Sequence, residues 1–248
     1  MSSPVKESSD LLEVLNRSKR IAFLTGAGVS TDSGIPDFKT MDREWPFSVP
    51  RATATSISFF NRDRRMFWEA FHYMFTSKTG GVLPNHFHRA VAGLEGKGKD
   101  VVVLTQNIDG LHQAAGTSQV LELHGNLRQV ICNRPSCKYA EPLTLEHNED
   151  SRCPQCNKLL RPDTVLFGEA PRGFGDAKQV AIEAELLIVA GTALEVGPVN
   201  DLPRLREWYF PERETVWVNR MNPPYGYVFS HKYTGELVDF SSLLEKVD

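Results

Sequence analysis

Four cysteines lie close together in the middle of the chain, arranged as two pairs. Four residues separate Cys132 from Cys137, two separate Cys153 from Cys156, and fifteen residues lie between the pairs. This is close to the spacing at which four thiolates bind one zinc ion tetrahedrally, although the first pair is slightly wider than usual. Four protein ligands leave no coordination position for a substrate, so we expect one structural Zn2+. Two disulfides, or four unrelated buried thiols, are the alternatives.

A second segment that could do chemistry is the glycine-rich run after the first apolar segment. Gly26 and Gly28 stand where the backbone of a dinucleotide-binding loop approaches a pyrophosphate, with a helix N-terminus facing the negative charge. The third glycine of the usual fingerprint is absent, because Thr31 occupies that position. The two glycines alone therefore predict phosphate binding no more strongly than a tight structural turn. Further along, Asp37 and Phe38 stand on a loop rich in glycine and proline.

Four short apolar runs are the elements that would position these segments. They cover 21–24, 101–104, 186–190 and 216–218, and they lack the apolar–polar alternation of a half-exposed sheet. Such runs are typical of strands in a parallel sheet that is covered on both faces. Each run is followed directly by Gly, Thr, Asn or Gln, and open parallel sheets bind ligands at the carboxyl ends of their strands. We therefore expect these four loops to converge on one ligand site.

The segment between the first two runs predicts a helix, and the cysteine region predicts a small insertion. Phe67, Ala70, Phe71 and Met74 recur at helical spacing and form one apolar face, which we interpret as facing the core. From Cys132 to residue 161 the apolar content falls, as expected for a small inserted module. The apolar residues 120–123 indicate one more strand, directly before a histidine.

The composition is that of an ordinary globular protein. The chain has 248 residues, a formal net charge of -3, 41% hydrophobic and 24% charged residues, which excludes a disordered or fibrous chain. Because no broad basic field is present, we expect no direct nucleic-acid partner. The longest apolar stretch, 186–194, is far shorter than the roughly 18–20 residues that span a bilayer, and the charged N-terminus is unlike a signal peptide. We therefore expect no membrane association, a cytoplasmic location and a monomer.

Several longer motifs occur in a fixed order along the chain. They are GAGVSTDSGIPDF at 26–38, TQNIDGLH at 105–112, His124-Gly125 with the paired cysteines, RPDTVLFGE at 161–169, GTALEVGP at 191–198 and Asn219. On these motifs the chain resembles the sirtuins, NAD-dependent protein lysine deacylases, over almost its whole length. The resemblance implies an α/β fold in which a Rossmann-like parallel-sheet domain carries a smaller lobe made of a helical module and a zinc ribbon.

The resemblance also implies how the chain is divided. The Rossmann-like NAD-binding domain would be discontinuous and comprise 1–40, 92–127 and 161–248. The helical module would cover 41–91 and the zinc-binding module 128–160. NAD and the acyl-lysine protein or peptide would bind in the cleft between the two lobes.

The resemblance assigns catalysis to three residues. Asn107 and Asp109 would surround the nicotinamide, and His124 would be the general base that activates a ribose hydroxyl after the acyl group is attached. Taken singly, each could equally serve a strand-end turn or a structural hydrogen bond. The residues that would contact NAD are Gly26, Ala27, Gly28, Asp37, Phe38, Lys39, Gln106, Asn107, Ile108, Asp109, Gly191, Thr192, Ala193 and Asn219.

Two of these positions depart from the family pattern. Lys39 stands where most sirtuins carry Arg, and a point charge cannot make the bidentate contact of a guanidinium. Ala193 stands where the family usually has Ser, so that one hydrogen bond to NAD, a net effect of about 1 kcal/mol or less, would be missing. Neither departure removes the chemistry.

The substrate would be held by a second set of residues. By the resemblance, the peptide backbone is clamped by segments that include Val165, Phe167, Gly168, Glu169 and Val196, and main-chain pairing of this kind reads sequence weakly. Alignment of the helix with the family places Phe71 and Met74 where sirtuins that prefer succinyl or malonyl groups carry Tyr and Arg. An acidic acyl group would enter an apolar pocket there at a cost of several kcal/mol. We therefore expect a neutral acyl group, acetyl first; the alternative is that both residues are simply core.

The expected activity is NAD-dependent removal of acetyl groups from protein lysines, giving nicotinamide and O-acetyl-ADP-ribose. The alternatives are a protein mono-ADP-ribosyltransferase and a non-catalytic NAD-sensing or protein-binding module. The presence of His124 favours deacylation over simple transfer. His86 and His88 look like a metal pair, but they stand at an expected helix start and we assign them no catalytic role.

Overall fold

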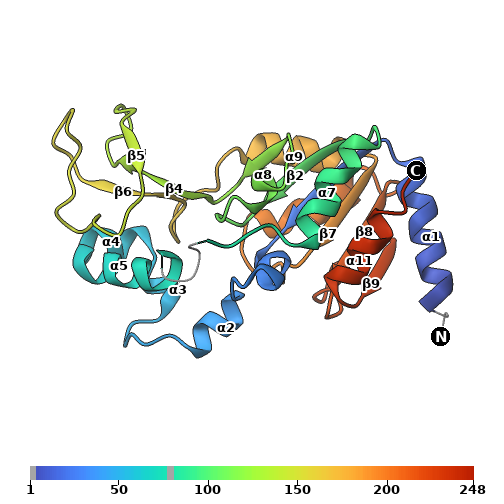
Figure 1. The fold of residues 1–248 in the computed structure, drawn as a ribbon, viewed down its shortest axis with the longest axis horizontal. Coiled ribbons are helices and arrows are strands. Elements are labelled where there is room, and N and C mark those ends of the chain that lie inside the picture. The colour runs from blue at the N-terminus through green and yellow to red at the C-terminus, as the bar shows by residue number, and fades with distance from the viewer. Residues whose placement is uncertain (1–3, 77–80) are drawn as a thin grey trace.

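The computed structural model describes residues 4–76 and 81–248, and its larger part is built on a parallel sheet (Figure 1). The six strands lie in the order β3-β2-β1-β7-β8-β9, and every neighbouring pair is parallel. Their bounds are β1 Arg20–Thr25, β2 Asp100–Thr105, β3 Val120–Glu122, β7 Leu186–Ala190, β8 Glu214–Asn219 and β9 His231–Thr234. The four strands that the apolar runs predict are confirmed as the centre of this sheet. The order reverses between β1 and β7, and open sheets of this type bind ligands at that switch point.

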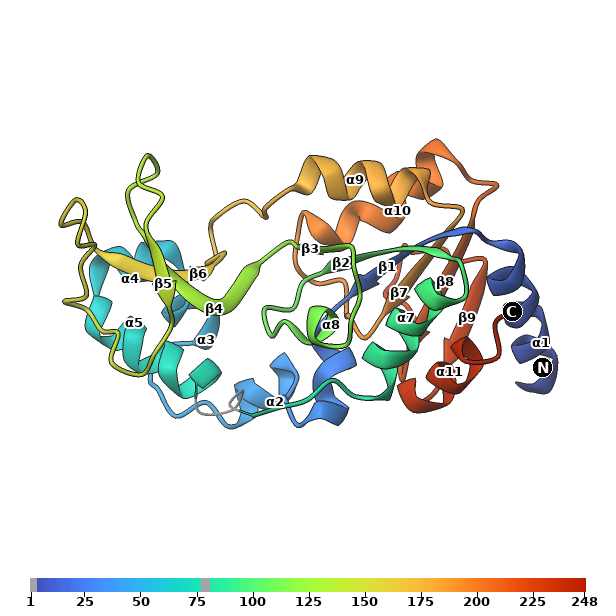
Figure 2. The ribbon, with the colours of Figure 1, turned by 45° about the horizontal axis from the view of Figure 1, so that its top comes forward.

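Helices cover both faces of this sheet, as the continuous apolar runs predict (Figure 2). On one face, buried side chains of α1, α7 and α11 pack against alternate strand residues such as Phe23 and Val103. On the other face, α9 and α10 pack against the intervening residues such as Leu24 and Leu104. The bounds are α1 Pro4–Arg17, α7 His86–Gly96, α9 Phe174–Glu183, α10 Leu202–Tyr209 and α11 Leu237–Leu244.

The smaller lobe combines short helices with a three-stranded sheet. The helices are α3 Arg51–Ala54, α4 Ile57–Arg62 and α5 Arg64–Phe71, and the strands β4 Gly125–Cys132, β5 Ala140–Pro142 and β6 Leu160–Thr164 form an antiparallel sheet in the order β5-β4-β6. One core joins the two, since Phe60, Phe67 and Trp68 of the helices pack with Val130 and Leu160 of the sheet. Figure 1 shows this lobe at one end of the molecule, at the far side from α1 and α11. The α/β fold with a smaller lobe is thus confirmed.

The predicted helix in this lobe forms, and it begins directly after Asp63. The carboxylate of Asp63 accepts a hydrogen bond from the Met66 amide at 3.1 Å and is the N-cap of α5. The α-helix ends at Phe71 and continues as a π-helical turn over His72–Thr76. Phe67, Ala70, Phe71 and Met74 are all buried.

Four short elements follow strands of the parallel sheet. Between β1 and the helices of the smaller lobe lie η1 Ala27–Ser33 and α2 Phe38–Arg43, whereas α8 Leu111–Ala114 lies between β2 and β3 and η3 Val199–Asp201 between β7 and α10. Within the described residues, no helix combines the length and the apolar character that a membrane span requires.

Candidate functional site

The glycine-rich loop lies directly against the loop that follows β7. The Gly26 amide donates to the Ala190 carbonyl at 3.2 Å, and the Gly28 amide donates to the Gly191 carbonyl at 2.8 Å. A Cβ at Gly28 would lie 2.8 Å from the Gly191 carbonyl oxygen, and one at Gly26 would lie 2.7 Å from Cβ of Thr192. Both distances are too short for real Cβ atoms, so this loop packing alone requires glycine at both positions. The two loops meet at the switch point of the sheet.

The end of β2 places Asn107 and Asp109 beside this loop. The Asn107 side-chain amide donates to the Gly26 carbonyl and to Ser30 Oγ, both at 3.1 Å. Ser30 in turn donates to Asp109 Oδ2 at 2.7 Å, and Oδ1 of Asp109 accepts from the Leu111 amide at 2.9 Å. Burial raises the pKa of Asp109, and the hydrogen bonds from Leu111 and Ser30 oppose that rise. Sequence reasoning missed Ser30, although it stands inside the quoted glycine-rich motif.

His124, between β3 and β4, is held in one tautomer by the main chain. Its Nδ1 lies 3.0 Å from the Gln106 carbonyl oxygen, which can only accept a hydrogen bond. The neutral ring therefore carries its proton on Nδ1, and Nε2 keeps a free lone pair. Burial lowers the pKa of His124, against the smaller opposing effect of the Gln106 hydrogen bond. The ring is thus neutral at pH 7 and can accept a proton.

A cavity of about 170 Å³ between the two parts collects most of the residues that we expected in the site. The sheet edge contributes Asn107, Asp109 and His124, and the helical module contributes Phe71 and Met74. The other expected residues that line it are Ala27, Phe38, Gln106, Ile108, Val165, Phe167, Gly168, Glu169 and Val196. Lining residues that the sequence reasoning did not single out include Ser30, Ile35 and Arg51.

The remaining expected NAD contacts lie outside this cavity. Several are grouped at the carboxyl ends of β7 and β8: Gln106 Nε2 donates to Thr192 Oγ1 at 3.1 Å, and Asn219 Nδ2 donates to the Thr192 carbonyl at 2.9 Å. Gly191 has a left-handed φ of 60° and touches the glycine-rich loop. Gly26, Gly28, Asp37, Lys39 and Ala193 are likewise not among the cavity-lining residues.

Asp37 has a structural task in the loop before α2. Its carboxylate accepts a hydrogen bond from the Thr40 amide at 2.8 Å and is the N-cap of α2. Burial tends to raise the pKa of Asp37, but the hydrogen bonds from Thr40 together with the charges of Arg43 and Lys39 hold the pKa below its usual value. Phe38 and Lys39, which follow it, are exposed.

The segment after β6 connects the cavity to both parts of the molecule. The Val165 amide donates to the His124 carbonyl at 2.8 Å, and Phe167 pairs through its main chain with Thr55 and Ile57 of the helical module. The Glu169 carboxylate forms an ion pair with Arg161, whose guanidinium donates to both carboxylate oxygens at 2.6 Å. Burial tends to raise the pKa of Glu169, but the hydrogen bonds from Arg161 and the Leu166 amide, together with the charges of Arg161 and Arg172, hold it below its usual value. Glu169 therefore fixes the segment, in which the main-chain amides of residues 165, 166, 167 and 169 all have partners within the protein.

Arg51 is a lining residue whose charge is already compensated. It is 8% exposed, and its guanidinium donates to both carboxylate oxygens of Asp42, at 2.7 and 3.2 Å. The guanidinium also lies 4.6 Å from the centre of the Phe38 ring. Because Arg51 and Asp42 are nine residues apart and on different elements, the sequence spacing does not predict this ion pair.

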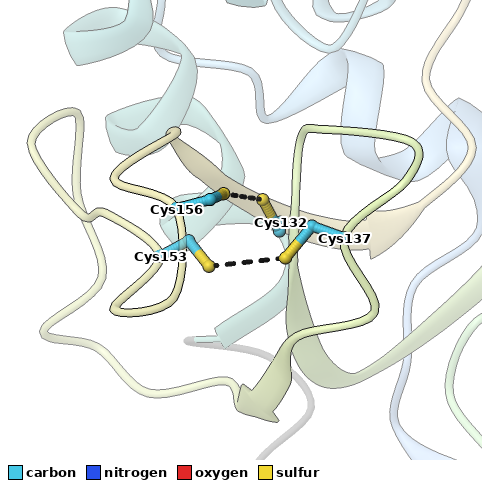
Figure 3. Close-up of side chains that lie close together, drawn as sticks. All are labelled: Cys132, Cys137, Cys153 and Cys156. Atoms are coloured by element: carbon cyan, nitrogen blue, oxygen red, sulfur yellow. Dashed lines mark hydrogen bonds between the residues drawn. The ribbon is translucent and has the colours of Figure 1, made fainter.

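The four cysteines gather at one point beside the end of β4 (Figure 3). The Sγ atoms of Cys132 and Cys156 are 3.4 Å apart, those of Cys137 and Cys153 are 3.7 Å apart, and all four lie within 4.8 Å of one another. A disulfide would need about 2.05 Å, so the disulfide alternative is wrong, as is that of unrelated thiols. Zn–S bonds of about 2.3 Å in a tetrahedron separate the sulfurs by about 3.8 Å, which the observed distances fit. The cluster is therefore suited to one zinc ion with no open position.

Comparison with known proteins identifies the family. Residues 26–198 match the family model described as Sir2 family. The chain belongs to the Sir2 family. It is similar to an NAD-dependent protein deacetylase of Chromobacterium violaceum, at 45% identity over 205 residues, which are 82% of this chain and 83% of that protein. It is also similar to an NAD-dependent protein deacetylase of Bacillus cereus, at 36% identity over 243 residues, 95% of this chain and 96% of that protein.

Solved structures of Sir2 family members have the same fold. A crystal structure of a Sir2 homologue in complex with NAD matches with a TM-score of 0.85 and 30% identity, over 96% of this chain and 92% of that chain. A complex of Sir2 with a p53 peptide and NAD+ matches with a TM-score of 0.80 and 35% identity, over 94% of this chain and 95% of that chain. The resemblance inferred from the motifs is thus confirmed.

Proposed function

We propose that this Sir2 family member removes acetyl groups from protein lysines, with NAD as co-substrate and nicotinamide and O-acetyl-ADP-ribose as products. One observation carries the proposal: the cavity at the sheet edge combines a histidine with a free lone pair, a buried asparagine linked through Ser30 to a half-buried aspartate, and an apolar end at the helical module. Relatives of nearly the same length carry the name NAD-dependent protein deacetylase, which supports it.

The side chains at the sheet edge suit NAD chemically. Gln106, Asn107 and Asn219 offer neutral amides, and Thr192 offers a hydroxyl, at the switch point where such ligands bind. We propose that Gly26, Ala27 and Gly28 face the diphosphate, that Gly191, Thr192, Ala193 and Asn219 hold the adenosine end, and that Asp37, Phe38 and Lys39 flank the cofactor. The nicotinamide end would contact Gln106, Asn107, Ile108 and Asp109. NAD supplies a ribose carbon whose bond to nicotinamide breaks as the acyl oxygen attacks.

The chain's own groups prepare this site in three ways. Asn107 is held by two hydrogen bonds from its side chain, so its carboxamide is oriented before any ligand binds. Asp109 supplies a carboxylate where positive charge develops. His124 Nε2, being unprotonated, takes a proton from a ribose hydroxyl, while Phe71 and Met74 keep water from the acyl end.

The substrate would lie across the mouth of this cavity. We propose that the main chain of residues 165–169 and of the segment containing Val196 clamps the peptide, with Val165, Phe167 and Gly168 nearest to the lysine. The acetyl group would then face Phe71 and Met74. Main-chain recognition of this kind implies broad selectivity among peptide sequences.

The zinc ion would be structural. Cys132 is the last residue of β4, the strand that begins directly after His124, so an ion held by the four cysteines anchors the far end of that strand. We propose the division 1–40, 92–127 and 161–248 for the NAD-binding domain, 41–91 for the helical module and 128–160 for the zinc-binding module. The closely spaced free thiols support a reducing compartment, and we propose the cytoplasm. The monomer remains a prediction.

Mass spectrometry of an acetyl-lysine peptide, incubated with the protein with and without NAD, tests the function. We expect loss of the acetyl group only with NAD, together with O-acetyl-ADP-ribose, and a reduction of about 100-fold or more for His124→Ala. Nicotinamide release with ADP-ribose attached to protein would instead establish the transferase. NAD binding without nicotinamide release, tested over neutral acyl groups of several lengths, would establish the non-catalytic module.

A further inference from the structure

Behind Asn107 lies a row of buried polar groups that none of the steps above uses. The main-chain amide of Asn107 donates to Thr105 Oγ1 at 3.0 Å, and the Thr105 and Thr25 hydroxyl oxygens are 3.0 Å apart. His112 Nε2 lies 3.1 Å from the Thr25 hydroxyl. Thr25, Thr105 and His112 are each at most 3% exposed. The row therefore crosses from β2 to β1 and on to α8 without contact with solvent.

A second buried histidine stands behind the first. The rings of His88 and His112 have centroids 4.8 Å apart and meet edge to face at 70°. His88 Nδ1 accepts a hydrogen bond from the Asn85 amide at 3.3 Å, so the neutral His88 ring must carry its proton on Nε2. Within the described residues, this Nε2 and the Nδ1 of His112 are both buried and have no partner.

The Thr25 hydroxyl fixes the direction of the row, because it donates its one proton to Thr105 Oγ1. Its oxygen can therefore only accept from His112, so the neutral His112 ring carries its proton on Nε2 and its Nδ1 is a bare acceptor. The Thr105 oxygen also accepts a hydrogen bond from the main-chain amide of Asn107. Burial keeps both rings neutral, since it lowers the pKa of His88 to about 4 and that of His112 to about 3.

We propose that His112 is a positioning residue for Asn107. It donates to the Thr25 hydroxyl, which donates to Thr105, and the Thr105 oxygen oriented in this way accepts the hydrogen bond from the main-chain amide of Asn107. The inference rests on the proposed function, because it assumes that Asn107 acts at the nicotinamide end. His112 itself does not line the cavity and so does not touch the ligands. A displacement of Asn107 by a fraction of an ångström would slow the step that breaks the nicotinamide bond while the peptide site is unchanged.

Two matched pairs of variants test this. Thr105→Val removes the hydroxyl and keeps the shape, whereas Thr105→Ser keeps the hydroxyl. His112→Phe removes both ring nitrogens, whereas His112→Gln retains an N–H near the position of Nε2. Thr117→Val is the control, since Thr117 Oγ1 is buried with no partner within the described residues and lies outside the row. All variants are measured below their unfolding midpoints.

The expected result is a split between kcat and KM. Thr105→Val and His112→Phe should lower kcat for nicotinamide release about 10-fold or more, with the KM for the acetyl peptide within about 2-fold of the wild type. Thr105→Ser and His112→Gln should recover most of that loss, and Thr117→Val should retain full kcat. Wild-type kcat in His112→Phe, or a His112→Gln variant no better than His112→Phe, would overturn the inference.

Hydrogen exchange of the Asn107 amide, followed by NMR, gives a readout that does not depend on activity. Thr105→Val and His112→Phe should lower its protection about 10-fold or more, relative to neighbouring β2 amides, and His112→Gln should not. If the wild type proves inactive, the proposed function fails, and this measurement still decides whether the row holds Asn107. Unchanged protection in Thr105→Val and His112→Phe would refute the positioning role.

Discussion

The acyl end of the cavity should discriminate strongly between acetyl-lysine and succinyl-lysine. Phe71 is fully buried there and Met74 is 3% exposed, so a succinyl carboxylate would leave water for an apolar surface. Among the described residues that line the cavity, Arg51 provides the only ammonium or guanidinium group. Its charge is compensated by both oxygens of Asp42. A carboxylate entering this end therefore finds no unpaired ammonium or guanidinium group among the described residues that line the cavity.

The magnitude follows from the cost of burying an unpaired charge. Removing one partner of a buried ion pair costs about 3–5 kcal/mol, which is the appropriate scale for a carboxylate without a cation. Since about 1.4 kcal/mol corresponds to a factor of ten, 3 kcal/mol predicts a kcat/KM for succinyl-lysine at least about 100-fold below that for acetyl-lysine. Butyryl-lysine is a neutral control of similar length, and we expect it to stay within about 15-fold of acetyl because its two added methylenes together gain at most about 1.6 kcal/mol.

The assay is mass spectrometry of one peptide carrying each acyl group in turn, at matched NAD. Met74→Arg should raise the ratio of succinyl to acetyl turnover by placing a cation at the apolar end, and Asp42→Asn should raise it by freeing Arg51. Succinyl turnover equal to acetyl turnover in the wild type would refute the reasoning. An unchanged ratio in both variants would show that the acyl group does not face Met74 and Arg51.

Three further predictions concern stability. Metal analysis should find one zinc per chain. Cys137→Ser should release the zinc and lower the thermal unfolding midpoint by about 10 °C or more, as measured by calorimetry, because a closed thiolate site stabilises the fold directly. Arg206 is fully buried and donates to the main-chain carbonyls at the end of α9, so Arg206→Met should lower the free energy of unfolding by about 3–5 kcal/mol in urea, and a change below about 1 kcal/mol would contradict this. Burial lowers the folded-state pKa of His88 to about 4 and of His112 to about 3, below the unfolded value of about 6.5, so the unfolded chain binds these protons first. The stabilisation that comes from keeping these two histidines neutral is therefore fully present above about pH 6.5. As the pH drops toward 4, the free energy of unfolding should fall by about 1.4 kcal/mol per pH unit for each histidine. Urea midpoints that stay equal from pH 7 to pH 5 would refute this prediction.

The central strands could be predicted because both faces of the sheet are buried. In that setting consecutive residues in the middle of a strand are apolar, and the four runs are therefore visible without any alternation. β9 was missed because His231–Thr234 is a short edge strand, in which exposed and half-buried residues alternate and no apolar run forms. The π-helical turn after α5 was also missed, since the apolar spacing continues through it to Met74 although the backbone changes.

The parts of the candidate site that could not be predicted depend on contacts between distant segments. Ser30 reaches Asp109 across 79 positions, and Thr25 reaches His112 across 87. Neither pair has a spacing that a helix or a strand would impose, so only the meeting of β1, β2 and α8 in the fold brings them together. Motif comparison marks the same segments without showing which side chains hold one another.

In the glycine-rich loop, the sequence pattern favours a phosphate-binding loop and a tight structural turn equally. A pyrophosphate loop and a tight turn both require glycine at 26 and 28, and the contacts with Gly191 and Thr192 supply a reason for both glycines that involves no ligand. The glycines therefore carry little weight for NAD binding by themselves. The support for NAD binding comes from the arrangement that this close loop packing produces. It brings the ends of β1, β2 and β7 together and places the buried Asn107 carboxamide and the free Nε2 of His124 at one cavity.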